Sequence, residues 1–188
     1  MVLASATIEN MREIIVIAHN IRSTYNVGAI FRTCEGLGIR RIILSGYTPY
    51  PDVSLTVAAP VCAYSASETC QTDPRLPHIR EKITKQIHKT ALGAEAIVPF
   101  EYHDAPDFSE LQASGYRIAA LEQAENSINL ADYRAPEKLA LLLGEEVYGV
   151  PAELLRQVDD IVEIPMRGQK ESFNVSVAAG IALYELTK

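Results

Sequence analysis

The chain has 188 residues, of which 48% are hydrophobic and 22% charged, a composition that argues against disorder and fits one globular domain. Its net charge of −7 argues against nucleic-acid binding over the whole surface, although a local basic patch remains compatible with it. The three cysteines form no CxxC pair and lack zinc-ligand spacing, so we expect reduced cysteines and no metal site. Neither a secretory signal nor an apolar run of roughly 20 residues is found, which favours a cytoplasmic protein without membrane contact.

Short β-branched runs alternate with helical patterns along the chain. In the first part of the chain we expect a strand at 13–18, a helix at 26–37, a strand at 41–45, a helix at 81–90, a strand at 96–100 and a helix at 109–114. In the second part we expect strands at 116–121 and 139–143, a helix at 151–157, a strand at 161–164 and a helix at 173–186. Strands separated by helices predict an α/β fold in a single domain over 1–188: a mostly parallel sheet with helices on both faces.

The first expected helix has one apolar face, formed at helical spacing by Val27, Ile30, Phe31, Cys34 and Leu37. On a helical wheel Arg32 lies nearly opposite this stripe, so we expect its side chain to point into solvent. Such a position fits an ordinary solvated charge or a group that contacts a ligand.

A long proline-rich segment runs from Gly46 to about Pro77, and long connections of this kind are often functional. The stretch 75–89 that follows carries five basic residues against one acidic residue. It is the best candidate for an RNA-facing strip, with a solvated helix face as the alternative.

The last expected helix reads NVSVAAGIALYEL over 174–186 and is apolar nearly all round. A helix of this kind requires burial on more than one side. Either one side packs on the sheet and the other on a partner subunit, or the helix is completely buried within the monomer.

Polar and glycine residues follow the expected strands in three segments, at 19–38, 141–151 and 161–185. Ligands of open α/β sheets bind in the crevice at the carboxyl ends of the strands, so we expect the site there. The dinucleotide pattern GxGxxG, the phosphate-binding pattern GxxxxGK[ST] and the hydrolase pattern GxSxG are all absent from the sequence.

Motifs in these three segments carry a family resemblance. The first has an N-x5-R element at Asn26 and Arg32, and the second a G-x-E-x-x-G loop at Gly144, Glu146 and Gly149. The third is an I-P-M-x-G…S-F-N-V-S stretch, matched by Ile164, Pro165, Met166, Gly168, Ser172, Phe173, Asn174 and Ser176. In this order, and over 14–186, the motifs resemble those of the SpoU/TrmH-like branch of the SPOUT superfamily of RNA methyltransferases. Phe173 stands where leucine is common in the family.

The resemblance implies a SPOUT fold whose C-terminal chain forms a deep trefoil knot, which physical priors would not propose. It also implies an enzyme that transfers a methyl group from S-adenosylmethionine to a ribose 2′-hydroxyl of tRNA or rRNA, leaving S-adenosylhomocysteine. The implied assembly is a homodimer through the last helix, in agreement with the apolar circumference of that helix.

The resemblance also implies site residues. Candidate catalytic residues are Arg32, Asn26, Glu146, Ser172 and Asn174. Arg32 would clamp an RNA phosphate and so orient the 2′-hydroxyl, Asn26 and Glu146 would hold Arg32 and the motif loops in place, and Ser172 and Asn174 would order the third loop or cap the last helix. Candidate cofactor contacts are Leu121, Glu122, Gly144, Ile164, Met166, Ser172, Phe173 and Asn174. Candidate RNA contacts are Arg22, Arg32, Arg75, Arg80, Lys82, Lys85 and Lys89.

Other functions stay open from the sequence. The alternatives are a SPOUT enzyme that methylates a base, a catalytically silent RNA-binding or dimerisation module, and a methyltransferase for small molecules, which the acidic charge favours. No large N- or C-terminal RNA-binding extension is expected, so substrate choice would come from the dimer surface, the proline-rich segment or a helper protein.

Overall fold

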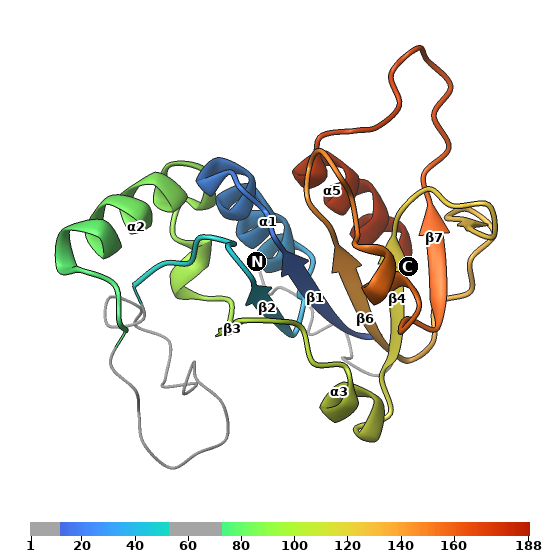
Figure 1. Ribbon diagram of the computed structural model, residues 1–188, viewed down its shortest axis with the longest axis horizontal. Helices are drawn as coiled ribbons and strands as arrows, with labels where there is room; N and C mark the ends of the chain where they lie inside the picture. The colour runs from blue at the N-terminus through green and yellow to red at the C-terminus, as the bar shows by residue number, and fades with distance from the viewer. Residues whose placement is uncertain (1–11, 53–72) are drawn as a thin grey trace, which may run out of the picture.

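The computed structural model describes residues 12–52 and 73–188, whose arrangement is shown in Figure 1. In chain order the elements are β1 (Glu13–His19), α1 (Thr24–Gly36), β2 (Arg41–Ser45), α2 (Pro77–Ala91), the short 3-10 helix η2 (Ala94–Ala96), β3 (Phe100–His103), α3 (Ser109–Ala113), β4 (Arg117–Leu121), β5 (Ile128–Asn129), β6 (Lys138–Leu143), α4 (Ala152–Leu155), β7 (Asp160–Glu163) and α5 (Val175–Leu186).

The described strands form one sheet in the order β3-β2-β1-β6-β4-β7-β5, and every pairing in it is parallel. Near the centre, Ile17 of β1 is aligned with Ile43 of β2 and with Leu142 of β6. Strands covered on both faces need no polar alternation, which explains the nearly continuous apolar runs of β1 and β6. The predicted α/β fold with a mostly parallel sheet is confirmed.

Helices pack on both faces of the sheet, as predicted. On one face, α1, α2 and α5 contribute Phe31, Ile87 and Leu183 to the larger cluster of buried side chains. On the other face, α3 and α4 contribute Leu111 and Leu154 to a second cluster. In Figure 1, α1 and α5 lie side by side, and the two helices are in contact. The segment between β7 and α5 extends beyond the ends of the strands (Figure 1).

The strand predicted at 96–100 is wrong in its position. Residues Ala94–Ala96 form η2, and the strand begins only at Phe100. The reason is local: Gly93 has a φ of 98°, and the buried Glu95 carboxylate bonds His88 Nδ1 at 2.6 Å and accepts from the backbone N–H of Gly93 at 3.0 Å. These contacts hold a tight turn where β-propensity alone suggests a strand. The short strand β5 was not predicted either.

The last helix is not completely buried, so of the two alternatives left open by the sequence, complete burial within the monomer is wrong. Ala179, Leu183 and other small or apolar residues of α5 pack on the larger cluster. Val177, Ile181 and Tyr184 lie on the opposite side and are 51%, 40% and 60% exposed. Their spacing of four and three residues makes them one continuous stripe along the helix.

The proline-rich segment is described only in part, because residues 53–72, with Cys62 and Cys70, lie outside the described residues. Cys34 of α1 is a buried free thiol, and burial raises its pKa, which makes it unreactive. Within 12–52 and 73–188, no helix is long and apolar enough to cross a membrane. The trefoil knot stays a prediction, since strand order alone does not settle how the chain is threaded.

Candidate active site

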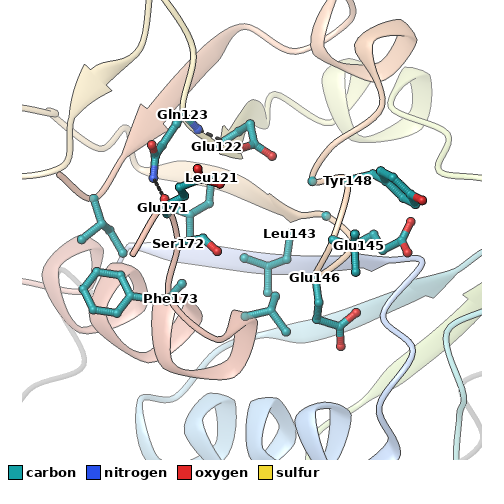
Figure 2. A pocket seen from close by; sticks show the side chains of 16 residues that line it. Leu121, Glu122, Gln123, Leu143, Glu145, Glu146, Tyr148, Glu171, Ser172 and Phe173 are labelled. Atoms are coloured by element: carbon teal, nitrogen blue, oxygen red, sulfur yellow. Dashed lines mark hydrogen bonds between the residues drawn. The ribbon is translucent and has the colours of Figure 1, made fainter. Parts of the chain in front are cut away.

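A pocket of about 290 Å³ lies at the carboxyl ends of β4, β6 and β7, where the parallel sheet places ligands (Figure 2). Its walls come from three stretches of chain: the end of β4, the loop after β6, and the segment that leads into α5. The lining residues are Leu121, Glu122, Gln123, Leu143, Gly144, Glu145, Glu146, Val147, Tyr148, Gly149, Ile164, Glu171, Ser172, Phe173, Val175 and Ala178.

The loop after β6 is a tight turn closed by its own backbone. Glu145 N donates to Gly149 O at 3.0 Å, and Gly149 N donates to Glu145 O at 2.9 Å. Gly144 packs so closely on the other arm that a Cβ there would lie 2.5 Å from Val150 N. Gly149 has a φ of 68° and leaves no room for a Cβ beside the Glu122 carboxylate. Both glycines of the second motif are therefore required by the backbone.

Glu122 holds this loop against the end of β4. Its Oε2 accepts from the backbone N–H of Val150 at 2.8 Å, and its Oε1 accepts from the backbone N–H of Gln123 at 2.9 Å. The Gln123 amide in turn donates to the carbonyl oxygen of Glu171 at 2.6 Å, as Figure 2 shows. Side chains at the end of β4 thus connect the loop after β6 to the segment before α5.

The three motifs are joined by a directional chain of hydrogen bonds. Asn26 Nδ2 donates to Glu146 Oε1 at 2.9 Å, which links the first motif to the second. Asn26 Oδ1 accepts from Asn174 Nδ2 at 3.1 Å, which links the first motif to the third. Asn174 Oδ1 then accepts from Ser176 N at 3.0 Å and caps α5. Because each amide is used at both ends, the orientation of both asparagines is fixed.

The Glu146 carboxylate is held in its charged form. Burial on its own raises the pKa of this group, but hydrogen bonds from the Asn26 amide and from backbone N–H groups, including that of Arg22 at 3.2 Å, outweigh it. The net pKa of Glu146 is lowered. The neighbouring Glu145 carboxylate pairs with Arg22 Nε at 3.0 Å. Glu146 is therefore an anchor for the β1–α1 loop, which carries Arg22.

Most of the cofactor residues predicted from sequence come together here. The pocket is lined by Leu121, Glu122, Gly144, Ile164, Ser172 and Phe173, whereas Met166 and Asn174 are not among its lining residues. Of the predicted catalytic residues, Glu146 and Ser172 line the pocket, and Asn26 and Asn174 stand behind it in the hydrogen-bond chain. Asn174 caps α5, one of the two roles foreseen for it; α5 begins at Val175, two residues later than expected.

Arg32 is exposed, as its wheel position predicted, and it is not among the residues that line the pocket. Within the described part of the chain it has no hydrogen-bond or ion-pair partner. Along α1 it lies six residues after Asn26, which is about 9 Å of helix rise. The structure therefore leaves this cation unengaged and outside the pocket formed by its own chain.

The basic strip divides into two groups. Arg75 pairs with Asp73 at 2.5 Å and lies over the ring of Tyr50 at 3.4 Å, and Arg80 pairs with Asp52 at 3.5 Å. These two arginines are engaged inside the molecule. The side chains on the exposed face of α2 are Lys82, Lys85 and Lys89, of which Lys85 pairs with Glu81 one turn away.

Gly149 of the second motif also lines the pocket. Several other pocket residues were not named as site candidates from the sequence: Gln123, Leu143, Glu145, Val147, Tyr148, Glu171, Val175 and Ala178. Most of them are immediate neighbours of the motif positions, so extending each motif by one or two residues would have found them. The sequence contains no signal that predicts the hydrogen bond between Gln123 and Glu171.

Comparisons with known proteins identify the family of the chain. The sequence model of the SpoU rRNA Methylase family matches residues 61–184. The tRNA (guanosine(18)-2′-O)-methyltransferase of Aquifex aeolicus is 28% identical over 177 residues, which are 94% of this chain and 70% of that protein. The tRNA (guanosine(18)-2′-O)-methyltransferase TARBP1 of Mus musculus is 28% identical over 180 residues, 96% of this chain but only 10% of that protein.

Among solved structures, the AdoMet-bound rRNA methyltransferase from Sinorhizobium meliloti superposes with a TM-score of 0.70 at 24% identity, covering 94% of this chain and 56% of that chain. At this identity the likeness concerns the fold. The chain thus spans only part of the length of several proteins that it matches. With the family model covering well over half of the residues and the motif segments meeting at one pocket, the chain belongs to the SpoU rRNA methylase family.

Proposed function

We propose that this chain transfers a methyl group from S-adenosylmethionine to a ribose 2′-hydroxyl of tRNA or rRNA. The observation that carries the proposal is the convergence of three motifs: the second and third line one pocket, and Asn26 of the first bonds to both. The names of the Aquifex and mouse relatives, both 2′-O-methyltransferases, support the same reaction.

The pocket has the chemistry that S-adenosylmethionine requires. Apolar side chains such as Leu121 and Ile164 and the glycine backbone at Gly144 suit an adenosine, which binds between apolar walls and backbone polar groups. Glu122, Glu145, Glu146 and Glu171 are among the lining residues, and their negative charges favour a cofactor that carries a cationic sulfonium and ammonium group. When bound, the cofactor supplies an electrophilic methyl group, and its sulfur leaves as the thioether of S-adenosylhomocysteine.

The protein residues act by positioning. We assign Leu121, Glu122, Gly144, Ile164, Ser172 and Phe173 to the cofactor, and Met166 and Asn174 to the segment that closes over it. Asn26 and Glu146 hold the loops in register through their 2.9 Å hydrogen bond. Arg32 contacts the RNA phosphate beside the reacting ribose and so fixes the 2′-hydroxyl in line with the methyl group. The proton of the 2′-hydroxyl passes to that phosphate or to water.

The exposed stripe of α5 supports a homodimer. Val177, Ile181 and Tyr184 are exposed on this helix, and Phe173, which precedes the helix, is 40% exposed and lines the pocket. A self-complementary interface over this stripe would bury these side chains in a two-fold dimer.

The same dimer explains why Arg32 lies outside its own pocket. Because α1 packs beside α5, Arg32 stands next to the proposed interface, and Phe173 of the other chain brings that chain's pocket to the same interface. We therefore propose that the Arg32 side chain serves the pocket of the partner subunit.

The RNA is proposed to lie across this dimer. The candidate contacts to the RNA sugar-phosphate backbone are Arg22 at the pocket edge and Lys82, Lys85 and Lys89 on α2. The surface between them is shaped by Arg75 and Arg80. We further propose that the chain is one catalytic domain with a knotted C-terminal segment. We also propose a cytoplasmic location and a helper protein for substrate choice.

Transfer of labelled methyl from S-adenosylmethionine to unmodified tRNA and rRNA tests this function. We expect incorporation with the wild-type chain and loss by orders of magnitude with Arg32→Ala, at unchanged cofactor affinity and melting temperature. Arg32→Lys should be nearly as inactive as Arg32→Ala, since lysine lacks the planar fork. Full activity of Arg32→Ala, or cofactor that fails to bind the wild-type chain, would contradict the proposal.

A further inference from the structure

Two tyrosine rings stand in solvent at the mouth of the candidate active site. Tyr148 lines the pocket and is 80% exposed, and Tyr47, which follows β2, is 51% exposed. In Figure 2 the Tyr148 ring lies on the side of the pocket opposite Phe173. Large aromatic side chains held in water beside a pocket commonly mark a contact surface for a ligand.

Both rings are presented by short turns with defined backbone contacts. Tyr148 belongs to the turn closed by the paired hydrogen bonds of Glu145 and Gly149, at 3.0 and 2.9 Å. Tyr47 follows Gly46, whose φ is 66°, and its N–H donates to Asn20 Oδ1 at 3.2 Å. The backbone that carries each ring is therefore fixed before a ligand arrives, which lowers the entropy cost of binding.

Arg22 lies with them. Its guanidinium centre is 6.0 Å from the centroid of the Tyr47 ring, and its Nε pairs with Glu145, the residue that starts the Tyr148 turn. Tyr148 lies in the same turn as Glu145, three residues further along the chain, and the Arg22 side chain is 61% exposed. Tyr47, Arg22 and Tyr148 thus form one exposed group, here called the rim cluster.

We propose that the rim cluster stacks unpaired nucleobases of the RNA that flank the methylated ribose. This inference rests on the proposed function and adds the part of the substrate that the pocket mouth recognises. Exposed RNA bases stack on aromatic rings and on arginine planes, and stacking tolerates any base because each base has a π-face.

The charge near the pocket favours stacking over phosphate attraction as the main contact. Glu145 and Glu146 lie beside the rim cluster, and the whole chain carries a net charge of −7. A polyanion is held poorly by such a surface through charge alone, whereas a ring contact needs no net positive charge. The rim cluster supplies that contact where the reacting nucleotide must be held.

The experiment compares RNA affinity with cofactor affinity in a set of variants. The probe is total tRNA and rRNA from cells that lack the enzyme, labelled at the 3′ end. S-adenosylhomocysteine affinity is measured by calorimetry on the same preparations. The variants are Tyr148→Ala, Tyr148→Phe, Tyr148→Leu and the double variant Tyr47→Ala/Tyr148→Ala; the control is Ile97→Ala, which removes a side chain that is 61% exposed outside the pocket.

We expect Tyr148→Ala to weaken RNA binding by about 5- to 150-fold, with a further loss in the double variant. Tyr148→Phe should retain the RNA affinity of the wild type, and Tyr148→Leu should not. The affinity for S-adenosylhomocysteine should stay at the wild-type level in all variants. Unchanged RNA affinity in the double variant, or equal rescue by leucine and phenylalanine, overturns the stacking role. Loss of S-adenosylhomocysteine binding in Tyr148→Ala would assign the ring to the cofactor instead. A wild-type chain that binds neither RNA would refute the proposed function, and the inference with it.

Discussion

The hydrogen-bond chain from Glu146 through Asn26 to Asn174 makes a sharp prediction for the substitution Asn26→Asp. The change is nearly isosteric, but it replaces the Nδ2 that donates to Glu146 Oε1 at 2.9 Å with an acceptor oxygen. One hydrogen bond to a charged group, worth about 1.5–3 kcal/mol, is lost. Two carboxylates also face one another, and at about 4 Å and an effective dielectric constant near 20 their repulsion is about 4 kcal/mol.

Residue 26 and Glu146 are only partly buried, so structural relaxation and solvent screening will reduce the sum of these two energies. We therefore expect a loss of about 2–4 kcal/mol in unfolding free energy at neutral pH. The loss should depend on pH. In the wild type the lowered pKa of Glu146 stabilises the folded state above about pH 4.5, and this stability is lost as the pH falls through the folded pKa. In Asn26→Asp the facing carboxylates share a proton and have a raised pKa, so the variant is closest to the wild type near pH 4–5 and weakens as the pH rises.

Urea unfolding of both proteins across pH 4.5–8 measures the effect. Asn126→Asp is the matched control, since this asparagine is exposed and its side chain has no hydrogen-bond partner among the described residues. It adds the same charge without facing Glu146, and should leave the unfolding free energy within about 0.5 kcal/mol of the wild type. A stability of Asn26→Asp equal to that of the control at pH 8 would refute the reasoning.

Three further predictions concern the loop, the assembly and the shared site. Glu122→Gln should lose about 1–3 kcal/mol in unfolding free energy and bind S-adenosylmethionine more weakly. One of the two carboxylate oxygens that accept from Val150 N and Gln123 N is replaced by an NH2 group, which cannot accept a hydrogen bond, and unchanged thermal unfolding would contradict this. Ile181→Asp should sediment as the 20.7 kDa monomer while the wild type sediments as a dimer, and two dimers would reject the α5 interface. Inactive Arg32→Ala and Gly144→Val chains, unfolded together in equal amounts and refolded, should recover about a quarter of the wild-type activity, since only mixed dimers combine an intact pocket with an intact arginine. No recovery would place Arg32 at its own pocket.

Much of the fold follows from patterns of short range in the sequence. The apolar spacing of α1 predicted both its buried face and the exposed position of Arg32. Runs such as LALLL in β6 predicted buried parallel strands. The strand predicted at 96–100, in contrast, begins only at Phe100, because the left-handed Gly93 and the buried Glu95 hold a turn before it. Glu95 is held by His88, seven residues earlier, and this contact has no local sequence signal.

The site was predictable at the motif positions and less so between them. Gly144 follows from the motif, and the structure adds that a side chain there would overlap the opposite arm of the turn. The bond between Asn26 and Asn174 joins residues 148 positions apart, and no local pattern indicates which partner each amide selects. The same holds for Tyr47, which follows β2, and Tyr148, which follows β6, since they are connected through Arg22 and Glu145 only in the folded chain.

The central claim is that the methyl group goes to a ribose oxygen, and alkaline hydrolysis of the labelled RNA tests it most directly. Alkali cleaves RNA through attack of the 2′-hydroxyl on the adjacent phosphate, so a 2′-O-methyl group protects that linkage. We predict that the label introduced by the wild-type chain is recovered in alkali-stable dinucleotides and, after enzymatic digestion, in 2′-O-methylnucleosides. Label recovered in mononucleotides that carry a methylated base would contradict the account.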